Sequence, residues 1–514
     1  MKKNKNILIL IMSCTFVTFL LSCEDKLDLY PLNELLPDDV YNSAEGYKSV
    51  LAKVYASYTQ IGNGGGRNDV PNDYSADFVR SLWNMQELPT DDAQDLWGAF
   101  KDLTDVNFNP GSMMIQALFQ RNMFMITTAN EFIAQSSDDA MTNRNISESD
   151  QSAIRTYRAE ARFVRALGYW VLMDAYGNPP FVVETDPIGS SFMPQQINRA
   201  DLYNYIEGEL LEIEPLMIEP GENEYARADR AAVWSLLARL YLNAEVYVGQ
   251  NRYNEAAEYS KRVIDSGVFS LSDNYSNLFK ADNDSNNREI ILPVTYDAVE
   301  GGTFGGTTFL INAAHGPDPA LYGISGGWSG IAGKPQLPLV FGEDFETTKD
   351  KRALFGPVRS DGNIWVFKYN NMNSDGTPSP NPDGSTVNTD FPLFRLAEIY
   401  LTYSEAVLRG GSGDQPAILY INELRKRAFG TDYPGDLTSI TLDELLDERQ
   451  RELYWECTRR TDLIRFGKFT SSDFLWSFKG GVEGGTGVDD HFKLYPLPSA
   501  EMLANPSLVQ NPGY

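Results

Sequence analysis

Residues 230–266, RAAVWSLLARLYLNAEVYVGQNRYNEAAEYSKRVIDS, carry the pattern that decides the fold. The first half predicts a helix over 231–242, because its leucines recur at helical spacing and would share an inward face. A turn through Gly249 separates it from a second helix over 253–264. The inward face of that helix combines large and small side chains: Tyr253, Ala256, Ser260 and Val263.

This alternation of large and small side chains across a helix pair, with Tyr-x-x-Ala opening the second helix, resembles tetratricopeptide repeats. The pattern returns at 395–409 and 417–428, which are joined by the helix-breaking run Gly-Gly-Ser-Gly. Another apolar stripe predicts a helix over 153–175, and a further long helix is expected from Leu442 to Thr458. The predicted fold class is mostly α, a tetratricopeptide-like scaffold of helical pairs. Its helices are expected mainly in 40–60, 114–266 and 395–466.

Two segments between the helical blocks have a different composition. Residues 62–112 and 267–394 are rich in Gly, Asn, Asp, Ser and Pro, with short apolar runs such as 290–294. This composition predicts loops with a few short strands. Large loops on a rigid frame are where binding residues usually lie. We therefore expect a loop-rich binding subdomain within one folded unit that spans 23–514.

The N-terminus has the features of a lipoprotein signal peptide. Lysines at the start precede an apolar run over 7–21 that is short for a membrane span, and Leu-Leu-Ser-Cys ends at Cys23. This ending resembles a bacterial lipobox, which implies removal of residues 1–22 and acylation of Cys23. The alternative is an ordinary secretory signal with a chance cysteine. Several buried acyl chains would anchor the protein stably to a membrane.

Charge and composition exclude several classes of ligand. The chain has 71 acidic and 43 basic residues, a net charge of −28. Nucleic acid is therefore a poor partner, because its phosphates must be met by clusters of Lys and Arg. Polyanionic sugars are disfavoured for the same reason, and neutral ligands are favoured.

No catalytic motif stands out. The sequence has no H-E-x-x-H, no G-x-S-x-G and no Walker loop. We expect Cys457 to be a buried thiol in the middle of a helix, and the only histidines are His315 and His491. Glycosidases need two carboxylates about 5 to 10 Å apart, and nothing selects such a pair among 71 acidic residues. The charged residues over 448–462 are expected to form structural salt bridges.

One acidic run has the alternating oxygen ligands of a calcium loop: Asp282, Asp284 and Asn286. It lacks the glycine and the acidic residue that an EF-hand has at its sixth and twelfth positions. The alternative is a solvated acidic turn.

Several runs, in order and over nearly the whole chain, closely resemble the SusD/RagB family of surface glycan-binding lipoproteins. They include Ala159-Glu-Ala-Arg-Phe163, Tyr176-Gly-Asn-Pro-Pro180, Ala238-Arg-Leu-Tyr-Leu-Asn-Ala244, Arg395-Leu-Ala-Glu398, Asn422-Glu-Leu-Arg-Lys-Arg-Ala428, Arg460-Thr-Asp-Leu-Ile-Arg-Phe-Gly467 and the final Asn511-Pro-Gly-Tyr514. The resemblance implies an outer-membrane lipoprotein facing the cell exterior, with a SusC-like TonB-dependent transporter as partner. It implies no catalytic activity and no cofactor beyond an optional structural calcium ion.

The chain is also similar to the starch-binding member of that family. The resemblance implies that three aromatic side chains form an arc that follows the curve of an α-glucan. Two polar side chains would bind sugar hydroxyls. These residues are Trp97, Phe304 and Trp328 for the arc, with Arg80 and Asp102 as the polar pair.

Sugar chemistry supports this assignment, because the apolar face of a pyranose packs on aromatic rings while its hydroxyls seek polar partners. Phe304 replaces a family tyrosine, Asp102 an asparagine, and Ala99 a further tryptophan. The alternative for the three aromatic residues is packing in the core.

The expected function is thus capture of starch-like α-glucan. The alternatives are another neutral glycan, a scaffold that binds only protein, and an unrecognised glycosidase.

Overall fold

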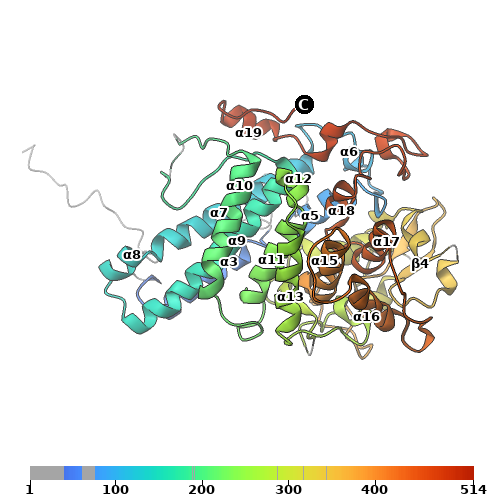
Figure 1. The fold of residues 1–514 in the computed structure, drawn as a ribbon, viewed down its shortest axis with the longest axis horizontal. Helices are drawn as coiled ribbons and strands as arrows, with labels where there is room; N and C mark the ends of the chain where they lie inside the picture. The colour runs from blue at the N-terminus through green and yellow to red at the C-terminus, as the bar shows by residue number, and fades with distance from the viewer. Residues whose placement is uncertain are drawn as a thin grey trace, which may run out of the picture.

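The computed structural model describes residues 40–60, 76–187, 189, 192–285, 287–316, 318–342 and 344–514. Helices dominate these ranges. Figure 1 shows long helices side by side in one part of the molecule and short elements with extended loops in another. No helix in these ranges is both long and apolar enough to cross a membrane. The predicted signal peptide and Cys23 lie outside the described residues.

The stretch 230–266 forms the predicted helix pair, α11 (Arg230–Leu242) and α13 (Tyr253–Asp265). Asp229 begins α11 by accepting the backbone N–H groups of Ala231 and Ala232 at 2.8 and 3.1 Å. The four residues predicted for the inward face of α13 are all buried. Between the two helices lies the short α12 (Ala244–Val248), which ends at Gly249 with the positive φ of 69° that favours glycine.

The remaining helices extend this scaffold on both sides (Figure 1). On one side α3, α7, α9 and α10 pack together, and on the other α15 packs on α13, with α16 and α17 beyond it. Their bounds are α3 (Ala44–Ala56), α7 (Met113–Gln135), α8 (Asp138–Asn143), α9 (Glu148–Tyr176), α10 (Arg199–Ile213), α15 (Leu396–Leu408), α16 (Ala417–Phe429), α17 (Leu442–Leu453), α18 (Arg459–Arg465) and α19 (Ser499–Ala504). The mostly α fold of helical pairs is confirmed.

The prediction of one helix from Leu442 to Thr458 is wrong. Helix α17 ends at Leu453, and both Trp455 and Cys457 have positive φ, 64° and 63°. Tertiary contacts hold this turn, since the Trp455 indole donates to the Asp92 carbonyl at 3.2 Å and packs edge-on against Trp83. Cys457 therefore lies in a turn and not in a helix, although it is buried as expected, and burial raises the pKa of its thiol.

Buried ion pairs join the C-terminal helices to the rest of the chain. The Arg395 guanidinium contacts Glu289, Glu452 and Glu456 at 2.6 to 2.8 Å, and Arg352 contacts Glu448 and Glu452. Removing one partner from such a network leaves an uncompensated charge in the interior. The network therefore fixes the relative positions of β6, α17 and the loop after Asp350.

The loop-rich part holds two small antiparallel sheets. One has the order β1-β3-β5-β4, and the other pairs β2 with β6. Their bounds are β1 (Ala93–Asp95), β2 (Ile290–Val294), β3 (Ile331–Gly333), β4 (Phe355–Val358), β5 (Ile364–Val366) and β6 (Phe391–Arg395). The short helical elements are α6 (Lys101–Thr104), α14 (Gly306–Ala314), η1 (Glu214–Leu216), η2 (Tyr275–Phe279), η3 (Pro319–Tyr322), η4 (Leu337–Phe341), η5 (Phe345–Thr347), η6 (Gly430–Asp432), η7 (Lys479–Gly481) and η8 (Asp490–Lys493).

A ten-residue helix, α5 (Phe78–Glu87), lies where loops were expected. All of its residues are buried, the polar side chains of Arg80, Asn84 and Glu87 included. The helix is short, and the loop-like composition of the surrounding segment over 62–112 led to the loop prediction.

Candidate functional site

Two of the predicted aromatic residues are brought together by β1 and β3. Asp95 pairs with Ile331 at the end of the ladder, and the Leu96 N–H donates to the Gly330 carbonyl at 2.9 Å. Trp97 therefore leaves β1 where Trp328 approaches β3. The register places both indoles at the same end of the strand pair, although 231 residues separate them in the sequence.

A tight turn presents Trp97 to solvent. The Asp95 carboxylate accepts the backbone N–H groups of Trp97 at 3.1 Å and Phe100 at 2.8 Å, and burial raises the pKa of this carboxyl group. The Trp97 indole lies against Gly330, where an added Cβ would come within 2.0 Å of Cε2. The side chain is nevertheless 43% exposed. Trp97 thus has one face on the backbone and another open to ligand.

Phe304 lies at the start of α14. The Asp77 carboxylate accepts the Gly306 N–H at 3.0 Å and the Tyr296 hydroxyl at 2.8 Å, which ties this turn to the start of α5. Burial raises the pKa of Asp77 to about 6. The Phe304 ring is 42% exposed, and its centroid lies 6.3 Å from that of Trp328, with 42° between the ring planes.

Trp328 is half-buried and lies alongside α14, since its N–H donates to the Asn312 carbonyl at 2.5 Å. The structure therefore brings Trp97, Phe304 and Trp328 to the surface around α14 and the β1–β3 pair. None of the three is sealed in the core, which was the alternative for them.

The two predicted polar residues lie differently. Arg80, on α5, is only 4% exposed, and its guanidinium lies 4.1 Å from the centroid of the Phe309 ring. Phe309 also lies near two indoles, Trp83 at 5.7 Å and Trp97 at 6.3 Å between centroids. Arg80 thus supports the site from behind Phe309. Asp102 is partly exposed on α6, the short helix that follows the Trp97 turn.

Sequence analysis missed a fourth indole beside these residues. Trp365 is half-buried on β5, and the Arg359 guanidinium lies 3.9 Å above its ring. A Cβ at Gly316 would touch both the Trp365 ring and the Ser329 hydroxyl, so Trp365 lies next to the residue after Trp328. The strand alternation of Ile364-Trp365-Val366, with both neighbours buried, is the signal that could have identified it.

The predicted calcium loop is described only in part, because Asn286 lies outside the described residues. Both carboxylate oxygens of Asp282 accept hydrogen bonds from Ser374, from its N–H at 2.8 Å and its hydroxyl at 2.5 Å. Asp284 accepts from the Ser285 hydroxyl at 3.0 Å. In the described ranges no three His, Cys, Asp or Glu side chains converge as metal ligands would. The calcium loop stays a prediction.

Comparison with known proteins gives a consistent result. Residues 349–514 match the model of the SusD family. The chain is 35% identical to the starch-binding protein SusD of Bacteroides thetaiotaomicron, over 96% of each protein. It is 23% identical to the SusD-like protein P25 of Formosa agariphila, over 99% of this chain and 98% of that protein.

Solved structures share the fold. A SusD homologue from Bacteroides thetaiotaomicron aligns with a TM-score of 0.73 at 19% identity, covering 93% of this chain and 98% of that one. Surface glycan-binding protein A from the same organism, in complex with laminarihexaose, aligns with a TM-score of 0.70 at 19% identity, covering 91% and 99%.

Proposed function

The chain belongs to the SusD family, and we propose that it is a cell-surface lipoprotein that captures starch-like α-glucan without cutting it. Trp97, Phe304 and Trp328 would bind the sugar rings. Cys23 would carry the lipid anchor in the outer membrane, facing the exterior, and a SusC-like TonB-dependent transporter would receive the glycan. The related starch-binding protein supports the choice of ligand.

The observation that carries the proposal is that two exposed rings, Trp97 and Phe304, and the half-buried Trp328 lie around one helix and one strand pair. An exposed aromatic ring gives up the free energy that its burial would supply. A cluster of such rings on one surface therefore indicates a binding site. A pyranose offers apolar C–H faces that pack on such rings. The site thus has the surface that an uncharged sugar chain requires.

The angle between the rings favours a curved chain. The planes of Phe304 and Trp328 are tilted by 42°, with their centroids 6.3 Å apart. A flat, extended glycan would present successive sugar faces to parallel rings, whereas a helical α-glucan turns from one residue to the next. Another curved neutral glycan is the alternative ligand. A structural neighbour was solved in complex with laminarihexaose, which supports this alternative.

The buried carboxylate closest to Trp97 in the sequence is not available for hydrolysis. Asp95, the acidic residue nearest to Trp97 in the sequence, is buried. Its carboxylate accepts hydrogen bonds from backbone N–H groups of its own turn. We expect no release of reducing ends when purified protein is incubated with amylopectin. Such release would establish the glycosidase alternative.

Isothermal titration with maltoheptaose and amylopectin, on protein that begins at residue 24, tests the proposal. We expect Trp328→Ala to weaken binding by about tenfold or more, the value of one lost aromatic stack and its buried area. Trp234→Ala, which removes a half-buried tryptophan from α11 of the scaffold, is the matched control. Equal affinities for wild type and Trp328→Ala would refute the site. No response to a broad panel of neutral glycans would favour the protein-binding scaffold.

A further inference from the structure

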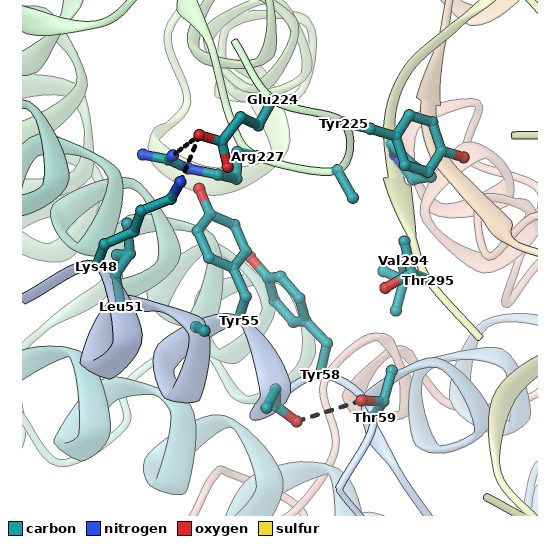
Figure 2. A pocket seen from close by; sticks show the side chains of 14 residues that line it. Lys48, Leu51, Tyr55, Tyr58, Thr59, Glu224, Tyr225, Arg227, Val294 and Thr295 are labelled. Carbon is teal, nitrogen blue, oxygen red and sulfur yellow. Dashed lines mark hydrogen bonds and ion pairs between the residues drawn. The ribbon is translucent and has the colours of Figure 1, made fainter. Parts of the chain in front are cut away.

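A pocket of about 350 Å³ lies between α3, the loop over 224–227 and the end of β2. None of the three aromatic residues of the proposed glycan site lines it. Figure 2 shows Tyr55 of α3 and Tyr58, two residues beyond that helix, on one side and Val294 with Thr295 on the other, with Tyr225 at the rim. Its volume is within the range of small-ligand sites.

The charged groups at the rim are paired with one another. Lys48 Nζ lies 2.7 Å from the Glu224 carboxylate, and Arg227 lies 3.3 Å from the same carboxylate (Figure 2). Arg227 also binds the buried Glu160 at 2.5 Å. Two cations and two anions therefore balance. A ligand in this pocket meets polar groups but no net charge, which favours a neutral molecule.

The walls of the pocket are aromatic and fixed. The Tyr55 hydroxyl donates to Glu160 at 2.7 Å and accepts from the Ala228 N–H at 2.9 Å. Tyr225 is 52% exposed, and its hydroxyl donates to Asp390 at 2.6 Å. Hydrogen bonds thus hold both rings in place before any ligand arrives, which lowers the entropy lost on binding.

The hydroxyl group of Tyr58 provides an independent sign of a ligand. Tyr58 is only 3% exposed, and its oxygen has no hydrogen-bond partner in the described part of the chain. Figure 2 shows this hydroxyl beside the Tyr55 ring, within the circle of lining residues. Buried hydroxyl groups are nearly always satisfied, so an orphan at a pocket wall calls for a partner. A sugar hydroxyl would serve.

From these observations we infer that the pocket binds one sugar unit of the same neutral glycan, as a second site apart from the aromatic row. The inference rests on the proposed function. A short path links the two sites, because Thr295 lines the pocket and the next residue, Tyr296, donates to Asp77. Asp77 in turn holds the Gly306 N–H, two residues after Phe304.

Adjacent positions on α3 allow a matched test. Ala52 is exposed and lines the pocket, whereas Lys53 is exposed and does not. Ala52→Trp would fill the pocket from the helix surface without disturbing the core, and Lys53→Trp places the same side chain outside it. Both variants are made in the Trp328→Ala background, so that binding at the aromatic row is weakened and the contribution of the pocket is easier to detect.

Saturation-transfer NMR with maltotriose is the readout. Trp328→Ala should keep weak millimolar binding, which Ala52→Trp should reduce further and Lys53→Trp should preserve. Tyr58→Phe should weaken this residual binding while leaving the melting temperature of the free protein unchanged or higher, since it removes an unsatisfied group.

The outcomes separate the two proposals. If wild-type protein binds maltoheptaose but Ala52→Trp and Lys53→Trp behave alike, the second site is wrong and the proposed function stands. If wild-type protein binds no maltooligosaccharide, the starch-like ligand is refuted and the inference falls with it.

Discussion

Gly330 offers a test of the site that leaves every group proposed to touch sugar chemically intact. A Cβ at this position would lie 2.0 Å from both Cε2 and Cζ2 of the Trp97 indole. Gly330 has no left-handed backbone angle, so alanine is compatible with its backbone. The ring of Trp97 must therefore move, and because the residue is 43% exposed the ring can turn toward solvent.

Gly330→Ala should affect both the stability of the protein and its affinity for glycan, each for a different reason. We expect Gly330→Ala to reduce the free energy of unfolding by about 1 kcal/mol, the lower end for overpacking, because the displaced ring lies at the surface. Loss of one aromatic stack should weaken glycan binding by about 1 to 1.5 kcal/mol. That change corresponds to about a tenfold rise in Kd.

Titration calorimetry with maltoheptaose and thermal unfolding measure the two effects. Gly326→Ala is the matched control, because a Cβ there meets nothing within 4 Å. A double mutant with Trp97→Ala separates direct from indirect effects, since two changes that act through one ring are not additive. The reasoning fails if Gly330→Ala binds as well as Gly326→Ala, or if its effect adds in full to that of Trp97→Ala.

Three further predictions concern charge. Glycan affinity should change by no more than about twofold between about 50 and 500 mM NaCl, because salt screens interactions between charges and the proposed ligand is uncharged. A steep salt dependence in calorimetry would indicate an anionic ligand. Glu452→Gln should destabilise the protein by about 3 to 5 kcal/mol in urea unfolding, because it leaves buried Arg352 and Arg395 short of a countercharge. In wild type the pKa of Glu452 is depressed. The stability that this carboxylate contributes is therefore complete above about pH 4.3 and is lost as the pH falls below that value. For Asp77, whose pKa is raised to about 6, the sign is opposite. The unfolded chain releases this proton first, so stability falls as the pH rises from 3.8 to about 6, and Asp77→Asn should flatten that part of the urea-unfolding profile.

The helical scaffold could be predicted because its signal is local. A helix with one buried and one solvated face shows that contrast in its sequence every three or four residues, as α13 does. The two errors have different causes. Helix α5 has only ten residues and lies within a segment of loop-like composition, whereas α17 ends early because Trp455 packs against a residue of α5, Trp83.

The sequence pointed to candidate site residues but not to how the fold arranges them. Resemblance to a known family pointed to Trp97, Phe304 and Trp328, and the structure places them together at the surface. The arrangement of these residues in space depends on strand register and close packing, and neither can be deduced from spacing along the chain. The support that Gly330 gives to Trp97, and the position of Trp365 on β5, depend on contacts between segments hundreds or tens of residues apart.

The aromatic row and the separate pocket would contact the same polymer at two places. The aromatic row can bind any stretch of a repeating glycan, so its affinity does not depend on where the glycan begins or ends. A second contact by the same chain is intramolecular and benefits from a high effective concentration. The pocket would then raise affinity for long glycans much more than for trimers. A ratio of amylopectin to maltotriose affinity that stays the same in Ala52→Trp and in wild type would contradict this cooperation, even if sugar binding at the row itself were established.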